Sequence, residues 1–167
     1  AAREEGVNAI YNAIEDINWF NTYKYQKESE FLGPVKMSVT VINSGSQHNV
    51  VPAECKFVVD VRTTDVYSNV EVLDIIKAHV KSDVHARSTR LNPSTIAVEH
   101  PIVQAGLGLG KKLYGSPTMS DQALLPIPSI KVGPGDSARS HTADEFIHLY
   151  EIEDGVKFYI ELLGKVL

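Results

Sequence analysis

Hydrophobic residues recur along this chain with two different spacings, and each spacing predicts a different element. Intervals of three and four residues put apolar side chains on one face of a helix. This spacing predicts a first helix near residue 10, a second after residue 68 and a last one near the C-terminus. The apolar faces of these helices are Ile10, Ala13, Ile14 and Ile17; Val72, Leu73, Ile76 and Val80; and Ile152, Val156, Tyr159, Ile160 and Leu163.

Polar residues and a proline support these helices at their ends. Glu4 and Glu5 favour the positive N-terminal end of the first helix. Ser68 is the predicted N-cap of the second helix, because its hydroxyl can accept a bond from a free backbone amide. His100-Pro101 opens a further helix, with the proline in the first turn, where it costs no hydrogen bond. The last helix is predicted to cover a sheet with its apolar face.

Strict alternation of apolar and polar residues predicts two half-buried strands. Their inward-facing residues are Val35, Met37, Val39 and Val41 in the first, and Cys55, Phe57, Val59 and Val61 in the second. The alternation places Asp60 and Arg62 together on the other face, where a solvated or salt-bridged pair is the simplest interpretation. A weaker alternation predicts a last strand over 85–91, and the β-branched run at 128–132 predicts a buried strand.

The order of these elements predicts an α/β fold of the α+β kind with two domains. Helix, strand, strand, helix and strand make a ferredoxin-like βαββαβ sandwich that lacks only its first strand. Residues 92–99 contain a proline and are interpreted as a linker, so the boundary is placed there. The predicted domains are residues 1–96 and residues 97–167.

Composition and charge argue against several classes of protein. The 167 residues are 43% hydrophobic and 22% charged, as in ordinary globular proteins. The net charge of -5, without a basic block, argues against a nucleic-acid or anionic-membrane partner, and no apolar run is long enough to span a bilayer. The single cysteine, Cys55, excludes an internal disulfide framework, favours a reducing, cytoplasmic compartment and is interpreted as a small core residue.

The candidate chemistry lies in the polar loop before the last helix. Gly133-Pro134-Gly135 ends the strand predicted at 128–132 and lets the backbone approach whatever lies above it. His141 follows on a loop beyond a buried strand, which is where α/β folds hold ligand chemistry. The simpler alternative is a surface loop in which Thr142 or Asp144 caps the final helix.

Several stretches of the chain resemble one known family in sequence and in order. Gly133-Pro134-Gly135 followed by Ser140-His141-Thr142-Ala143-Asp144-Glu145 resembles its C-terminal signature. His48-Asn49-Val50-Val51-Pro52 and Asp60-Val61-Arg62 resemble its Asn-x-x-Pro loop and Asp-x-Arg strand. Gly6-Val7-Asn8-Ala9 resembles the segment after its Gly-x-x-x-His-Ala motif. This is the zinc-dependent deacylase and exopeptidase family that includes acetylornithine deacetylase, succinyl-diaminopimelate desuccinylase, aminoacylase and glutamate carboxypeptidases.

The resemblance implies roles for three residues. Arg62 would bind the α-carboxylate of a substrate, a contact that suits a planar guanidinium, and Asn49 would place its carbonyl. His141 would be a zinc ligand in a site of two zinc ions, with cobalt as an alternative metal. The general base and the other ligands would come from a segment upstream of this chain, so no catalytic residue is assigned here. His48 is interpreted as an ordinary loop residue, and Asp144 as a helix-start carboxylate together with Glu145.

The resemblance further implies metal-dependent hydrolysis of the amide bond of an N-acyl amino acid, most like acetylornithine deacetylase of arginine biosynthesis. Residues 1–96 would be a lid that forms a homodimer, and residues 97–167 the C-terminal part of the α/β zinc-exopeptidase catalytic domain. The chain would be a portion of a longer protein, inactive alone, with a histidine, a His-x-Asp and a Glu-Glu pair upstream. The alternative is a non-catalytic module for dimerisation or small-ligand binding.

Overall fold

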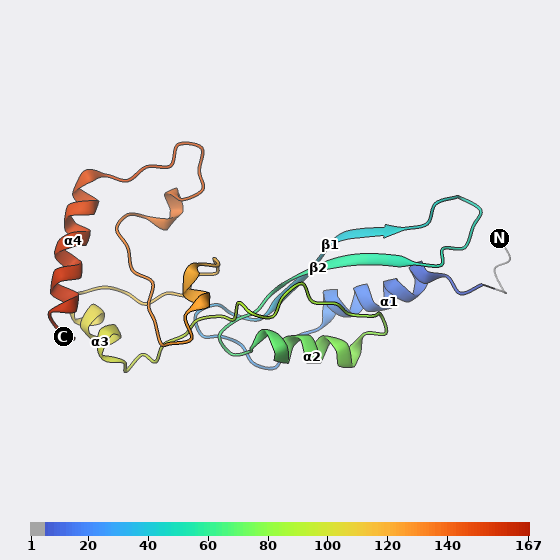
Figure 1. The fold of residues 1–167 in the computed structure, drawn as a ribbon, viewed down its shortest axis with the longest axis horizontal. Coiled ribbons are helices and arrows are strands. Elements are labelled where there is room, and N and C mark those ends of the chain that lie inside the picture. The colour runs from blue at the N-terminus through green and yellow to red at the C-terminus, as the bar shows by residue number, and fades with distance from the viewer. Residues whose placement is uncertain (1–5) are drawn as a thin grey trace. The chain divides into compact units, whose positions relative to one another are not determined.

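A computed structural model describes residues 6–167, which form four α-helices and one two-stranded antiparallel sheet (Figure 1). Internal contacts divide the chain into two units, the first ending at Pro93 and the second comprising Ser94–Leu167. The first unit contains α1 (Ala9–Thr22), β1 (Lys36–Ser44), β2 (Cys55–Arg62) and α2 (Asn69–His79). The second contains α3 (Pro101–Gly108), the short 3-10 helices η1 (Asp121–Leu124) and η2 (Ser137–Arg139), and α4 (Leu149–Leu163). The mixed α/β class predicted from the sequence is confirmed.

The two predicted strands pair with each other, and their register decides which side chains face the core. Val39 lies opposite Val59, and both pack against buried residues. A β-bulge between Val39 and Val41 then shifts the register, so that Val41 lies opposite Val58. Because one extra residue reverses the alternation of faces, Val41 is 47% exposed. The prediction that Val41 faces the core was wrong for this reason.

The core of the first unit combines side chains from both helices with one face of the hairpin. Its six buried residues are Phe20, Tyr25, Val35, Tyr67, Val72 and Ile76. Aromatic rings meet edge to face within it, with centroids 5.3 Å apart for Tyr25 and Tyr67. Burial, and then the neighbouring Tyr23 and Tyr67, raise the pKa of Tyr25 to about 12. Cys55 stays outside this cluster and is only partly buried.

Both helices of the first unit begin with a polar cap. Asn8 caps α1 by accepting a bond from the Ile10 amide at 3.0 Å, whereas the predicted contribution of Glu4 and Glu5 lies outside the described residues. Ser68 caps α2 as predicted, and Glu71 completes a capping box with it. The amide and then the hydroxyl of Ser68 hold the pKa of Glu71 below its ordinary value.

A buried carboxylate on α1 ties that helix to the chain that follows α2. Asp16 is only 4% exposed, and Ile14, which the spacing had placed on the buried face, is instead 45% exposed. Asp16 Oδ1 accepts a bond from the Lys81 amide at 3.1 Å, and Oδ2 accepts bonds from the Ser82 amide at 2.8 Å and hydroxyl at 2.5 Å. Three donors satisfy a charge that would otherwise be costly to bury.

The strand predicted at 85–91 does not form, and two of its carbonyls bond to a side chain instead of a neighbouring strand. The carbonyls of Thr89 and Leu91 accept bonds from the Asn69 side-chain amide at 3.3 and 2.8 Å. The Asn92 side chain accepts a bond from the Asn69 backbone amide at 2.9 Å. Asn69, at the start of α2, therefore donates hydrogen bonds that a neighbouring strand would otherwise provide. The sheet in the described part of this unit has two strands.

The second unit contains two packed helices and long irregular segments. Pro101 lies in the first turn of α3, as predicted. Val103 of α3 and Leu162 of α4 are the buried hydrophobic residues of the described unit. The predicted strand at 128–132 does not form, because residues 94–167 provide no second strand to pair with it.

The apolar face of α4 is consequently exposed, although the helix forms where it was predicted. The side chains on this face are between 38% and 68% exposed: Ile152, Val156, Tyr159, Ile160 and Leu163. The prediction that α4 covers a sheet is wrong for the described unit, since that unit contains no sheet. Within residues 6–167, every helix is too short or too polar to cross a lipid bilayer.

We expect Asp16→Ala to destabilise the first unit by about 2–3 kcal/mol, because it leaves two amides and a hydroxyl without their acceptor. The measurement is urea unfolding followed by the fluorescence of Trp19, the single tryptophan, which packs against the core of this unit. Asp74→Ala removes an exposed carboxylate from α2 and is the matched control. Equal unfolding midpoints for the two variants would contradict the assigned role of Asp16.

Candidate functional site

The two candidate substrate-binding residues lie at opposite ends of the β1–β2 hairpin. Asn49 is in the loop that joins β1 to β2, whereas Arg62 ends β2 and pairs with Lys36 at the start of β1. Eight residues form β2, and seven steps of a strand span about 23 Å. Within one chain, the structure therefore does not bring Asn49 and Arg62 together around one small substrate.

Arg62 is exposed and already has a charged neighbour. Its Nε donates a hydrogen bond to Asp60 Oδ2 at 2.8 Å, across the same face of β2. This confirms that alternation places the two side chains together. The side chains remain 65% and 47% exposed, so the pair contributes little to stability. The bond uses Nε, and the two terminal nitrogens of the guanidinium can form a two-pronged contact with a carboxylate.

The loop that carries Asn49 is attached to the start of α1. The Ala9 amide donates to the Pro52 carbonyl at 3.1 Å, and the backbone at Gly6 lies close to the Val51 side chain. Asn49 and His48 are both exposed on this loop. The segment at residues 6–9 and the Asn49 loop, which were singled out separately in the sequence, therefore lie at the same end of the hairpin.

His141 is exposed on a tight turn between η2 and α4. Its φ of 61° lies in the left-handed region, which few residues other than glycine adopt. The His141 amide donates to Glu145 Oε2 at 3.0 Å, and the Thr142 hydroxyl donates to the Arg139 carbonyl at 2.8 Å. These local bonds hold the unusual backbone conformation. Thr142 and Asp144 do not cap α4, and Glu145 bonds to the turn instead of the helix start.

An ion pair that sequence inspection missed joins this loop to α4. Arg139 Nη2 donates to Glu151 Oε1, and both side chains are less than 20% exposed. Glu151 Oε2 also accepts a bond from the His148 amide at 2.9 Å. The Arg139 guanidinium, and after it the His148 amide, hold the pKa of the Glu151 carboxyl below its ordinary value of 4.5. The spacing of His148 and Glu151 could have indicated a helix start, whereas no periodic signal marks Arg139.

The loop also packs along the side of α4. The Tyr159 hydroxyl donates to the Val132 carbonyl at 2.6 Å. A Cβ added to Gly155 of α4 would lie 3.0 Å from Pro134 Cβ, which shows how closely the loop approaches the helix. A Cβ added to Gly135, whose φ is 87°, would lie 3.3 Å from Ile147 Cδ1. Two glycines thus permit the close packing of this loop.

The residues present do not make a zinc centre by themselves. A catalytic zinc ion needs at least three protein ligands, and residues 6–167 contain no group of three His, Cys, Asp or Glu side chains that could hold a metal ion. His141 and His148 are separated by the turn and the start of α4, and the side chain of His148 stacks on Tyr150 with ring centroids 5.2 Å apart. His141 can therefore offer one imidazole but no complete metal site.

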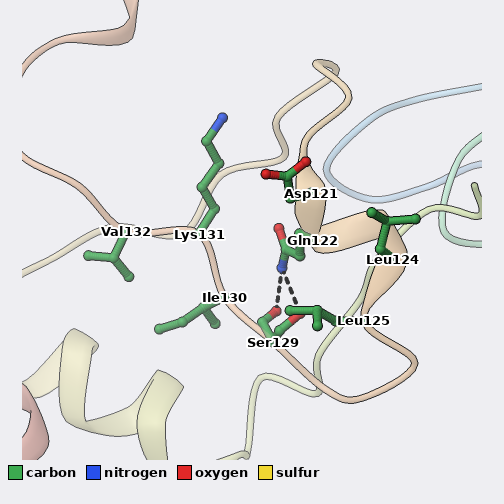
Figure 2. A pocket seen from close by; sticks show the side chains of 8 residues that line it. All are labelled: Asp121, Gln122, Leu124, Leu125, Ser129, Ile130, Lys131 and Val132. Carbon is green, nitrogen blue, oxygen red and sulfur yellow. Dashed lines mark hydrogen bonds between the residues drawn. The ribbon is translucent and has the colours of Figure 1, made fainter.

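An open depression of about 450 Å³ lies in the second unit between η1 and the segment at 128–132 (Figure 2). Gln122 Nε2 bridges its two walls by donating to the Ser129 carbonyl at 2.8 Å and hydroxyl at 2.9 Å. None of the three candidate site residues lines it. The lining residues are Asp121, Gln122, Leu124, Leu125, Ser129, Ile130, Lys131 and Val132.

Comparison with known proteins finds one family model and one relative that are similar to part of this chain. Residues 1–87 match the family model described as peptidase dimerisation domain. A segment of 80 residues is 26% identical to succinyl-diaminopimelate desuccinylase 2 of Ruegeria sp. (strain TM1040). This segment covers 47% of the chain and 20% of that relative, so the chain matches about one fifth of the relative's length.

The close approach of Pro134 to Gly155 can be tested with alanine. Gly→Ala inside a helix normally stabilises it by about 1 kcal/mol, but at Gly155 the added methyl meets a rigid proline ring. We expect Gly155→Ala to speed hydrogen exchange at residues 133–141, measured by mass spectrometry. Gly108→Ala in α3, where nothing lies within 4 Å of the added atom, is the control. Unchanged exchange in Gly155→Ala would show that the loop does not rest on α4.

Proposed function

Because the chain belongs to the peptidase dimerisation domain family, we propose that it supplies the dimer-forming lid and a metal-ligand loop of a hydrolase. The reaction is cleavage of the amide bond of an N-acyl amino acid. The observation that carries this proposal is the family match over residues 1–87, a segment that includes both candidate substrate-binding residues, Asn49 and Arg62. An acetylornithine-like substrate is the first candidate, and a succinylated amino acid is the second because of the desuccinylase relative.

Arg62 is the proposed ligand for the substrate's carboxylate. It stands exposed at the end of β2, and Asp60 holds its Nε edge. This contact orients the guanidinium and leaves its two terminal nitrogens free. These nitrogens can bind a carboxylate with two parallel hydrogen bonds. With its carboxylate bound to Arg62, the substrate would present its acyl amide at a defined distance from the protein. Binding energy would in this way orient the bond that is to be cleaved.

The length of the hairpin requires a second protomer in this proposal. Asn49 and Arg62 of one chain are separated by about the 23 Å length of an eight-residue strand, which exceeds the reach of both side chains toward one amino acid. A homodimer that forms through the lid would remove this difficulty. Arg62 of one protomer and the partner's Asn49 would then contact the same substrate molecule. In a two-fold dimer this arrangement creates two equivalent sites.

Mixed dimers test this arrangement directly. Asn49→Ala and Arg62→Ala are each expected to reduce the amidohydrolase activity of the full-length protein strongly. A mixed dimer of the two variants, isolated through two affinity tags, should recover roughly half of wild-type activity, because one of its two sites is then complete. A dimer in which both protomers carry Arg62→Ala is the control. Mixed dimers no more active than their parents would show that the two residues do not act across the interface.

His141 is the proposed metal ligand of this chain. The described residues provide no complete metal site, so its fellow ligands and the general base are assigned to other parts of the full-length protein. A zinc ion, or cobalt in its place, is the metal that suits an imidazole ligand. The supporting observation is the exposed position of His141 on a turn that its own neighbours hold in place.

We expect His141→Ala to lower acylate release by the full-length protein at least about 100-fold, the upper end of the loss seen when even an outer partner of a metal site is removed. Bound zinc, measured by atomic emission, should fall in parallel. His85→Ala, which removes an exposed histidine paired with Asp83 on the first unit, is the control. Full activity and full zinc content in His141→Ala would exclude the ligand role.

A non-catalytic dimerisation or ligand-binding module is the second candidate. The observation in its favour is that the first unit has its own core and its candidate arginine already has a partner in Asp60. A full-length protein that dimerises, binds N-acyl amino acids and shows no metal-dependent hydrolysis would support this alternative over the first.

A further inference from the structure

The loop that carries His141 is attached to α4 at several points, and one of them involves a charged side chain. At the first point Tyr159 bonds to the Val132 carbonyl at 2.6 Å, and at the second Pro134 packs on Gly155. At the third the Arg139 side chain reaches Glu151 in the first turn of α4. The third attachment is nearest to the candidate ligand, two residues before it in the chain.

The Arg139 side chain contacts both the loop and the first turn of α4. Its guanidinium pairs with Glu151 and also lies over the ring of Phe146, 4.9 Å from the centroid. Glu151 in turn holds the His148 amide. A planar cation can bond at its edge and stack with its face, whereas a lysine ammonium cannot do both. Glu151, in the first turn of α4, therefore bonds to both ends of the segment at residues 139–148.

The ion pair holds the Arg139 backbone in place, although one guanidinium nitrogen has no partner among the described residues. Arg139 Nε is buried and has no hydrogen-bond partner among the described residues, which is a cost for a charged group. Drawing the guanidinium into this position instead fixes the backbone at Arg139, whose carbonyl accepts the Thr142 hydroxyl. His141 lies between these two bonded residues, so the held backbone sets the direction in which its exposed side chain leaves the turn.

We propose that Arg139 is a positioning residue for His141, fixing the direction of the imidazole by clamping the turn to Glu151 at the start of α4. This inference rests on the proposed function of His141. The clamp requires both the charge and the planar shape of the guanidinium, so lysine would replace it only in part.

The test compares Arg139→Gln and Arg139→Lys in the full-length protein with Lys157→Gln, which breaks an exposed ion pair with Asp154 on the same helix. Three measurements are made: hydrogen exchange of residues 136–146, the NMR signals of the His141 ring, and kcat and KM separately. We expect faster exchange and a shifted His141 ring signal in Arg139→Gln, with unchanged signals from His48 and His85. The value of kcat should fall on the order of 10–100-fold, as for a small displacement of a catalytic group, with little change in KM.

A charge exchange provides the second arm of the test. Arg139→Glu combined with Glu151→Arg restores an ion pair of opposite polarity, and it should recover part of the exchange protection that each single variant loses. Unchanged exchange and ring signals in Arg139→Gln would overturn the positioning role, whatever the activity. If those signals change while His141→Ala stays fully active, the clamp stands and the proposed function of His141 fails, so the two failures are distinguishable.

Discussion

The antiparallel hairpin holds the two candidate ligand-binding residues one strand length apart, and this distance constrains every functional interpretation of the chain. A β-strand is stiff and rises by a nearly constant amount per residue. Asn49 in the hairpin loop and Arg62 at the far end of β2 therefore cannot approach each other through side-chain motion. The chain belongs to a dimerisation family, and under the proposed function a second copy would bring the missing side chain to each site.

The two units differ in how completely they bury their own apolar surface. The first has a cluster of six buried hydrophobic residues, and a buried carboxylate, Asp16, secures the chain that follows α2. In the second, Val103 and Leu162 are the buried hydrophobic residues of the described part, and one face of α4 is exposed. Contiguous apolar surface of this kind marks a contact surface. Under the proposed function, the remainder of a catalytic domain would cover it.

The His141 loop shows how an irregular segment can be ordered without a sheet. Its order comes from contacts with one helix: a tyrosine hydroxyl on a carbonyl, a proline against a glycine and an arginine between a carboxylate and a phenyl ring. Local bonds then support the left-handed backbone at His141. Such conformations persist where the surrounding structure determines them, and they are common at functional sites. Under the proposed function, the imidazole would bind a metal together with ligands that the described residues do not supply.

The features that the sequence determined by itself are those that depend on neighbours along the chain. Helical spacing predicted α1, α2 and α4, alternation predicted the two paired strands, and the same alternation placed Asp60 beside Arg62. Capping by Ser68 also followed from local chemistry. These predictions succeed because hydrophobic period and capping bonds involve residues a few positions apart.

Only the tertiary structure decided the features that need a partner far away in the chain. The runs at 85–91 and 128–132 have strand-like composition, but a strand requires a paired neighbour, and neither run pairs with one in the described residues. The bulge that turned Val41 outward, and the arginine that joins the His141 loop to α4, likewise depend on contacts that spacing does not encode. Local pattern predicts the face of a side chain only while the register stays regular, and tertiary contacts decide both the register and what each face packs against.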